Sequence, residues 1–193
     1  MEPAFTRLLP LIQALTRALL PCLDKPFVFF GHSLGGLISF ELTRLLYKDC
    51  GLSPVHLFVS ARRAPQLPAP TLPIHASSEP IFLEELRRLN GTPKAVLENA
   101  ELMQLLLPTL RADFAISETY VYTASTFLLD CPITAFGGLQ DQYSNYDSLE
   151  AWREQTSGTF LVQMLPGTHF FLNSAQPLLL QLLSQELHRI AGR

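Results

Sequence analysis

The sequence predicts an α/β fold, a mostly parallel sheet flanked by helices, and two neighbouring stretches support this prediction. Residues 27–30 are four consecutive apolar residues that lead into Gly-His-Ser-Leu-Gly at residues 31–35, and a run with helical spacing follows to about Lys48. Residues 55–60 form a second apolar run after the helix-ending Gly51. A strand, a helix and a strand in close succession form a βαβ unit, so the sheet is expected to be parallel here.

The composition indicates one domain with a substantial core: 193 residues, 48% of them apolar, with a mean hydropathy of +0.20. The net charge of −3 argues against nucleic-acid binding through a general basic field. Cys22, Cys50 and Cys131 are far apart, so we expect neither a disulfide framework nor a zinc site, and we expect a cytoplasmic location. No uncharged run reaches the ~18 residues of a transmembrane helix, so no membrane association is expected.

The region before and after the βαβ unit is assigned from apolar spacing and breaker residues. Residues 4–20 predict an amphipathic helix, bent or started late at Pro10. An extended loop is expected at residues 62–73, which contain Pro65, Pro68, Pro70 and Pro73. Helices are expected at residues 80–90, 93–107 and 109–122, with Pro108 separating the last two.

No strand pattern occurs from about residue 74 to residue 127. We therefore expect a helical lid there, within a single domain spanning residues 1–193, and the lid follows a strand end on the side where the Gly-His-Ser-Leu-Gly turn emerges. The alternative is a helical subdomain that only adds core.

The last third of the chain returns to alternating strands and helices. Strands are predicted at residues 133–137 and 160–165, a short helix at 149–156, and a closing amphipathic helix at 177–190. Asp147 and Glu150 have the spacing of a helix capping box.

The Gly-x-Ser-x-Gly turn between a buried strand and a helix is the context of a nucleophile elbow. Ser33 is expected at the turn apex, at the N-terminal end of the helix. There the N–H of Leu34 and the helix dipole favour developing negative charge, which predicts an oxyanion site. The alternative is a chance turn.

A nucleophilic serine needs a base, and the base needs an acidic group that orients it. In parallel sheets these groups lie beyond the carboxyl ends of strands, in the chain order serine, acid, histidine. His169 follows the last predicted strand, whereas the other histidines lie in the elbow, at a strand start, in the Pro-rich loop and on the last helix: His32, His56, His75 and His188. The side chain of His32 is expected to point away from the serine. Asp141 occupies the equivalent loop after the third strand and is the predicted acid. Asp147 is the fallback, and the alternative for Asp141 is a turn residue in a Gly-rich loop.

Beyond the elbow, several stretches resemble one family: residues 55–65 (Val-His-Leu-Phe-Val-Ser-Ala-Arg-Arg-Ala-Pro), 90–93, 110–114, 131–135, 151–152 and 167–172. The chain resembles the type II thioesterases of nonribosomal peptide and polyketide synthesis, which have an α/β-hydrolase fold, and their medium-chain relatives in fatty-acid synthesis. The likeness runs from about residue 8 to residue 188. The family's nucleophile, acid and base fall on Ser33, Asp141 and His169.

The resemblance implies hydrolysis of aberrant or misprimed acyl thioesters on the phosphopantetheine arm of an acyl or peptidyl carrier protein, with no metal or redox cofactor. Carrier proteins are usually acidic, so a local basic patch is expected. Its candidates are Arg62, Arg63, Arg87, Arg88 and Arg111. Alternatives are a medium-chain acyl-carrier thioesterase, a general carboxylesterase, or a truncated, non-catalytic carrier-binding remnant.

One departure from the family concerns the start of the chain. The family has several strands and a Gly-rich loop before the first helix, and that loop supplies a second N–H to the oxyanion hole. This sequence shows no counterpart, so we expect missing N-terminal strands, an exposed apolar edge on residues 27–31, and a fragment, a misassigned start or a degenerate gene product. Losing one such donor typically costs ~10²–10³ in turnover, which predicts a chain that is insoluble or nearly inactive alone.

Overall fold

The computed structural model describes residues 3–69 and 71–192. Four parallel strands form one sheet in the order β1 (Val28–His32), β2 (His56–Ser60), β3 (Ile133–Gly138) and β4 (Phe160–Leu165). The predicted parallel α/β fold is therefore confirmed. Because all four strands run the same way, their carboxyl ends meet at one edge of the sheet.

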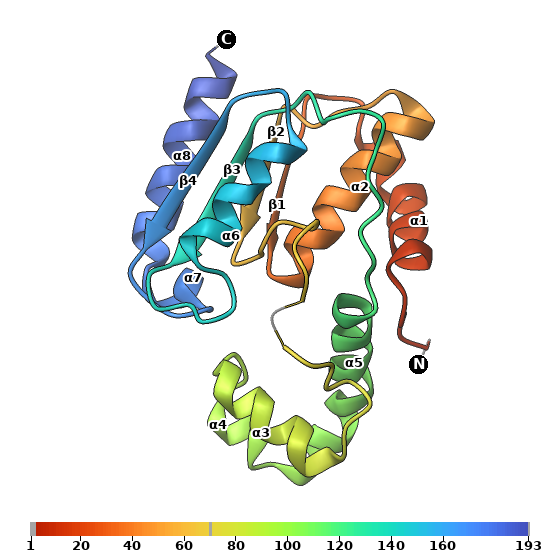
Figure 1. Ribbon diagram of the computed structural model, residues 1–193, viewed down its shortest axis with the longest axis vertical. Coiled ribbons are helices and arrows are strands. Elements are labelled where there is room, and N and C mark those ends of the chain that lie inside the picture. Colours follow the sequence, from red (N-terminus) through yellow and green to blue (C-terminus); the bar gives the residue numbers. More distant parts are fainter. Residues whose placement is uncertain (1–2, 70, 193) are drawn as a thin grey trace.

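Helices cover both faces of this sheet (Figure 1). Their bounds are α1 (Leu8–Leu19), η1 (Leu20–Cys22), α2 (Leu34–Cys50), α3 (Glu79–Leu89), α4 (Lys94–Leu97), α5 (Ala100–Glu118), α6 (Tyr146–Glu150), η2 (Ala151–Gln155), α7 (Phe171–Ser174) and α8 (Gln176–Ala191). Within residues 3–69 and 71–192, no helix has the length and apolar character that crossing a bilayer requires.

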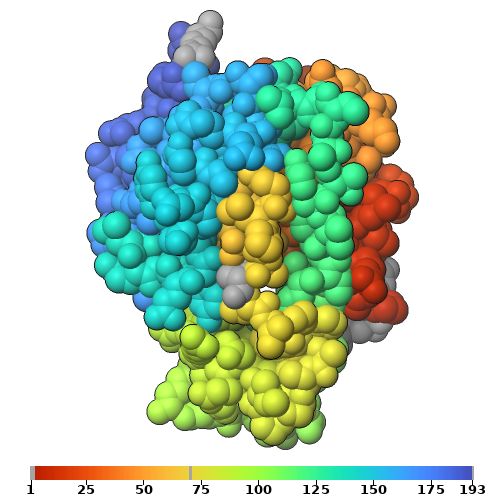
Figure 2. Space-filling view, viewed as in Figure 1, coloured from red at the N-terminus to blue at the C-terminus, as the bar shows by residue number. Residues whose placement is uncertain are grey.

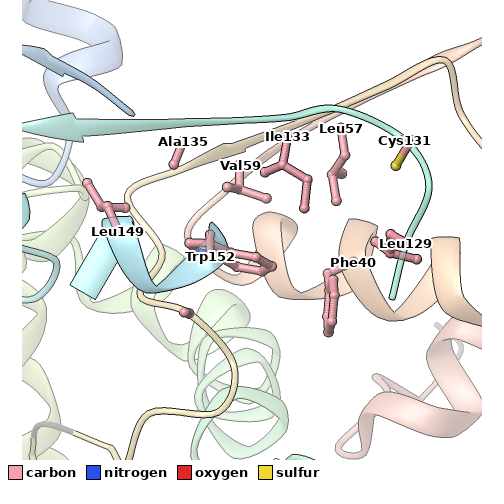
Figure 3. Close-up of a cluster of buried hydrophobic side chains, with 10 residues drawn as sticks. Phe40, Leu57, Val59, Leu129, Cys131, Ile133, Ala135, Leu149 and Trp152 are labelled. Atoms are coloured by element: carbon pink, nitrogen blue, oxygen red, sulfur yellow. The ribbon is translucent and has the colours of Figure 1, made fainter. Parts of the chain in front are cut away.

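The main core lies between the sheet and the helices α2, α6 and η2. Phe40 of α2 and Trp152 of η2 meet edge-to-face at 5.1 Å between ring centroids, and both are almost completely buried. Figure 3 shows these two rings facing apolar side chains of β2 and β3 such as Val59 and Ile133. The indole N–H of Trp152 donates a 2.7 Å hydrogen bond to the carbonyl of Arg62, so the loop after β2 is tied to this core.

The opposite face of the sheet packs against α7 and α8. Phe58, Phe136 and Leu165 from three neighbouring strands contact Phe171 of α7 and Leu179 of α8, and all five are buried. Burying such side chains contributes about 1.5–3 kcal/mol each. The sheet is thus covered on both sides, as near-continuous apolar runs in parallel strands require.

Helices α3, α4 and α5 form a separate group at the carboxyl edge of the sheet (Figure 1). Figure 2 shows α3 and α4 as a lobe below the body of the molecule. Together with the first half of α5, this lobe has its own apolar core, made of Phe82 and Leu86 from α3 and of Met103 and Leu107 from α5. The C-terminal half of α5 leaves the lobe and packs against α1 and α2 through Ile116.

Pro108 does not end a helix, so the prediction of two helices at 93–107 and 109–122 was wrong. Helix α5 runs through Pro108 from Ala100 to Glu118, and only the short α4 lies before it. Pro108 and Gln104 are exposed, so the carbonyl of Gln104, which loses its helical N–H partner, faces solvent. Buried residues on both sides, such as Met103 and Ile116, hold the two halves in place.

Other boundaries also differ from the prediction. Helix α1 begins two residues before Pro10, since a proline in the first turn removes an N–H that has no helical partner. The expected helix at 149–156 is divided into α6 and η2, and α7 was not predicted. The capping box was wrong, because the side chain of Asn145 caps α6 by accepting from the N–H of Ser148 at 3.0 Å. Pro70, assigned to the Pro-rich loop, lies outside the described residues.

The exposed apolar edge expected on residues 27–31 is present in the described sheet, along the side of β1 that faces away from β2. Strand β1 is its first strand, paired only with β2 among the described strands, and the side chain of Phe30 is 42% exposed.

Replacing Pro108 by alanine should stabilise the protein. The new N–H can bond the carbonyl of Gln104, and we expect a gain of about 1–2 kcal/mol in the free energy of unfolding, measured by urea denaturation. Pro93→Ala is the matched control, because Pro93 is the N-cap of α4 and gains no helical hydrogen bond. A gain of equal size in both variants would contradict this account of α5.

Candidate active site

The turn between β1 and α2 forces two backbone segments into contact. A Cβ placed on Gly31 would lie 2.1 Å from the carbonyl oxygen of Gly35, so only glycine fits at position 31. Ser33 stands at the apex with φ +53°, a conformation that non-glycine residues rarely adopt. Its N–H donates a 2.7 Å hydrogen bond to the carbonyl of Ser60, which holds this strained residue against the end of β2.

Leu34, the predicted oxyanion donor, is the first residue of α2. Its N–H is one of the four that an α-helix leaves without a partner in the helix itself. The positive end of the helix dipole lies at the same place, so the local field favours an anion beside Ser33.

Three predicted residues from distant parts of the chain meet at the carboxyl edge of the sheet. The Nε2 atom of His169 lies 2.9 Å from the Oγ atom of Ser33, and its Nδ1 atom lies 2.9 Å from the Oδ2 atom of Asp141. Ser33 follows β1, Asp141 lies in the loop after β3, and His169 in the loop after β4. The separation of 136 residues between Ser33 and His169 is bridged because parallel strands end together.

Both oxygens of the Asp141 carboxylate accept hydrogen bonds. Oδ2 accepts from the Ser144 hydroxyl at 2.6 Å as well as from His169, and Oδ1 accepts from the N–H of Tyr143 at 2.8 Å. Burial alone raises the pKa of Asp141, but the hydrogen bonds from His169 and Ser144 outweigh it and lower the pKa below its usual value. The resulting stabilisation is present at neutral pH and is lost as pH falls through this lowered pKa.

The competing candidates lie elsewhere. Asp147, the fallback acid, is exposed in the first turn of α6. His56 bonds the Thr134 hydroxyl at 2.9 Å inside the sheet, and His75 bonds the Glu118 carboxylate at 2.6 Å beside the Pro-rich loop. His188 contacts its own helix at the carbonyl of Ser184.

Three aromatic rings around His169 were not assigned to the site from the sequence. His32, Tyr143 and Phe170 have ring centroids 5.3, 5.7 and 5.1 Å from that of His169. Because His32 was expected to point away from the serine, it was left out of the site, yet its ring lies against that of His169. Tyr143 and Phe170 also lie within two residues of predicted site residues.

The lobe of α3 and α4 reaches this ring cluster through Gly91. A Cβ on Gly91 would lie 2.2 Å from the ring of Phe170, so the turn after α3 rests directly on the residue that follows His169. The preceding Asn90 has φ +56° and accordingly ends α3 in a left-handed conformation.

A cavity of about 310 Å³ opens beside His169 and Asp141. Most of the residues that line it have polar side chains, and they come from the end of α3 and the loops after β3 and β4: Arg88, Leu89, Asn90, Gln140, Asp141, Gln142, Tyr143, Thr168 and His169. The hydroxyl of Tyr143 is buried and has no hydrogen-bond partner among the described residues. Polar side chains therefore lie in the cavity wall next to the imidazole.

Comparison with known proteins gives a consistent result. The model of the family described as "Thioesterase domain" matches residues 1–187. The chain is 49% identical over 190 residues to the protein named linear gramicidin dehydrogenase LgrE of Brevibacillus parabrevis, covering 97% of this chain and 72% of that protein. It is 44% identical over 189 residues to gramicidin S biosynthesis protein GrsT of Aneurinibacillus migulanus, covering 98% and 73%.

Among solved structures, the type II thioesterase BorB from the borrelidin biosynthetic cluster superimposes with a TM-score of 0.87 at 33% identity. The match covers 96% of this chain and 75% of that one.

The elbow predicts opposite outcomes for two neighbouring glycines. Gly31→Ala should destabilise the protein by about 3 kcal/mol or more, because the added Cβ meets backbone that cannot move aside. Gly35→Ala should be neutral or stabilising by up to about 1 kcal/mol, since its Cβ meets no described atom within 4 Å and alanine favours helix. Denaturant unfolding followed by circular dichroism measures both, and similar stabilities for the two variants would exclude the contact at Gly31.

Proposed function

The chain belongs to the thioesterase family, which makes it a hydrolase of thioesters, and on that premise we propose that it removes acyl groups from the phosphopantetheine arm of carrier proteins in nonribosomal peptide or polyketide synthesis. The observation that carries the proposal is the hydrogen-bonded series Ser33–His169–Asp141. The gramicidin S and borrelidin pathways named for two relatives support this class of pathway.

In the proposed mechanism, the Oγ atom of Ser33 attacks the thioester carbonyl while Nε2 of His169 takes its proton. Asp141 accepts from Nδ1 and stabilises the imidazolium that forms. The N–H of Leu34 donates to the oxyanion, in the field of α2. His169 then returns the proton to the departing thiolate, and an acyl ester on Ser33 remains.

Deacylation uses the same groups with water in place of the thiol. His169 takes a proton from water, the resulting hydroxide attacks the acyl ester, and the proton passes to Oγ of Ser33 as the free acid leaves. The buried Asp141 keeps the imidazole in one tautomer through both halves.

The cavity beside His169 fits the leaving thiol. Because His169 delivers the proton to sulfur, the arm that carries the sulfur must lie on the imidazole side of the scissile bond. The cavity lies on that side, and its polar lining suits the amides and hydroxyl of a pantetheine arm. Arg88 lines it and can bind the phosphate of the arm, for which a cation at the rim is suited.

Some of the arginines predicted to form the basic patch are occupied by contacts inside the fold. Arg62 donates a 2.8 Å hydrogen bond to the Ser117 hydroxyl, and Arg111 donates one of 2.7 Å to the carbonyl of His75. Burial lowers the pKa of Arg62 to about 10, as expected for a guanidinium inside the fold. Arg63 is half-buried, and burial lowers the pKa of its guanidinium. Arg87 and Arg88 of α3 are exposed and remain the candidates for contact with an acidic carrier.

We further propose that residues 74–127 act as a lid that shapes the acyl site. Helix α5 joins the lobe to α2 through Ile116, and Gly91 joins it to Phe170 beside the base. Lid position and the surroundings of His169 are therefore linked by direct contact.

One assay separates the alternatives. A thioesterase of carrier proteins hydrolyses an acyl-phosphopantetheinyl carrier faster than an acyl nitrophenyl ester, and a general carboxylesterase shows the reverse preference. A comparison of acyl lengths identifies a medium-chain enzyme.

Ser33→Ala should lower kcat by about 10⁴ or more, because the residual rate comes from binding alone.

The control is carrier binding by Ser33→Ala, which should equal that of the unaltered chain. A non-catalytic remnant would show no labelling of Ser33 by a serine-reactive phosphonate. That result, with no thioester turnover, would refute the proposal.

The cavity assignment predicts a difference between two adjacent arginines. Arg88→Gln should raise KM for a phosphopantetheine thioester about 5-fold to 10-fold, the loss of one charge-assisted hydrogen bond, with kcat little changed. Arg87→Gln is the matched control, because Arg87 is also exposed on α3 and, like Arg88, is paired with a glutamate three residues earlier, but does not line the cavity. Equal effects, or an effect of Arg88→Gln on a nitrophenyl ester, would contradict the assignment.

A further inference from the structure

We propose that His32 is a positioning residue that holds the ring of His169 in line between Ser33 and Asp141. The proposal rests on the proposed function for the role of His169, and on three independent features of His32: its anchor, its ring contacts and its neutral charge.

The anchor is Ser60. His32 is the last residue of β1 and lies opposite Ser60 of β2, and its Nδ1 atom is 2.9 Å from the Ser60 hydroxyl. Ser60 is completely buried, and its carbonyl accepts the N–H of Ser33. One residue thus fixes both the backbone of the nucleophile and the side chain that precedes it.

The ring of His32 packs against the ring of His169 at 5.3 Å between centroids, inclined by 59°. Phe170 and Phe171 lie 5.5 and 6.0 Å from His32 and enclose it. Tyr143 contacts His169 edge-to-face at 5.7 Å. The imidazole that must face two partners at once is therefore held by aromatic neighbours from three segments.

A neutral imidazole at His32 suits its position beside His169. Burial, and secondarily the neighbouring His169, lower its pKa to about 4, against an opposing effect of Asp141. His169 and Asp141 are the titratable groups that act on it most. A neutral ring adds no repulsion when His169 becomes an imidazolium during turnover.

His56 provides an internal control on the same sheet. His56 is buried, whereas His32 is half-buried; like His32 it is bonded to a hydroxyl, that of Thr134, and burial lowers its pKa to about 4. It begins β2, however, at the amino end of the strands, whereas His32 ends β1 at the carboxyl end. A purely structural role would make the two histidines equivalent in turnover.

The test compares His32→Asn with His56→Asn in the full chain. At position 32, asparagine keeps a polar atom in place of Nδ1, which bonds Ser60, but lacks the ring; at position 56 it loses both the ring and the bond from Nε2 to Thr134. With an acyl nitrophenyl ester, His32→Asn should lower kcat about 10-fold to 100-fold with KM changed less than about 2-fold, as expected for a slightly misplaced base. His56→Asn should leave kcat within about 2-fold. Equal kcat values in the two variants would overturn the proposal.

A second readout does not depend on turnover. The Nδ1 proton of His169, hydrogen-bonded to Asp141, should give a low-field proton NMR signal that His32→Asn broadens and His56→Asn preserves. An unchanged signal in His32→Asn would overturn the proposal. If the ester but not the carrier thioester is hydrolysed, the proposed substrate is wrong while the His32 comparison stands.

If His32→Asn does not fold, Ser60→Ala releases the ring without removing it, and Thr134→Ala is its control. Ser60→Ala should lower kcat about 3-fold to 10-fold while Thr134→Ala leaves it unchanged. Equal kcat in these two variants would likewise overturn the proposal.

Discussion

Backbone atoms of β1 and α2 meet at Gly31 and Gly35, and a side chain on Gly31 has no room there. The chain reverses at this contact, and Ser33 takes a strained conformation in the reversal. The hydroxyl thereby stands at the head of a helix, while the carbonyl of Ser60 holds the backbone from the next strand. The site can exist only because the strain is stabilised by the buried sheet on which both strands end.

The rest of the site is built by fixing His169 from several directions. Asp141 is itself held by Ser144 and by the N–H of Tyr143, so it presents one oxygen to the imidazole in a fixed orientation. The turn after α3 contributes through Phe170, against which Gly91 rests. The electrostatics of the base therefore come from the loop after β3, and its packing comes from that loop, from the loop after β4 and from His32 at the end of β1.

The sequence was sufficient for features with a strong local signal or a rule of topology. The parallel sheet followed from apolar runs around a helix, and Ser33, Asp141 and His169 followed from the order of strand ends; the structure brings these three together, while their catalytic role remains a proposal. The path of α5 through Pro108 could not be predicted, because it depends on burial on both sides of an exposed proline. The contact of His32 with His169 depends on side-chain direction across strands, which spacing does not determine.

Trp152 is the only tryptophan of the chain, fully buried against Phe40 and hydrogen-bonded to the carbonyl of Arg62. Arg62 reaches in turn to Ser117 near the end of α5. The tryptophan fluorescence of the protein thus comes from a single indole, two hydrogen bonds away from α5. Its emission wavelength and quenching form a label-free optical signal of the joint between the sheet and α5, available without any engineered dye.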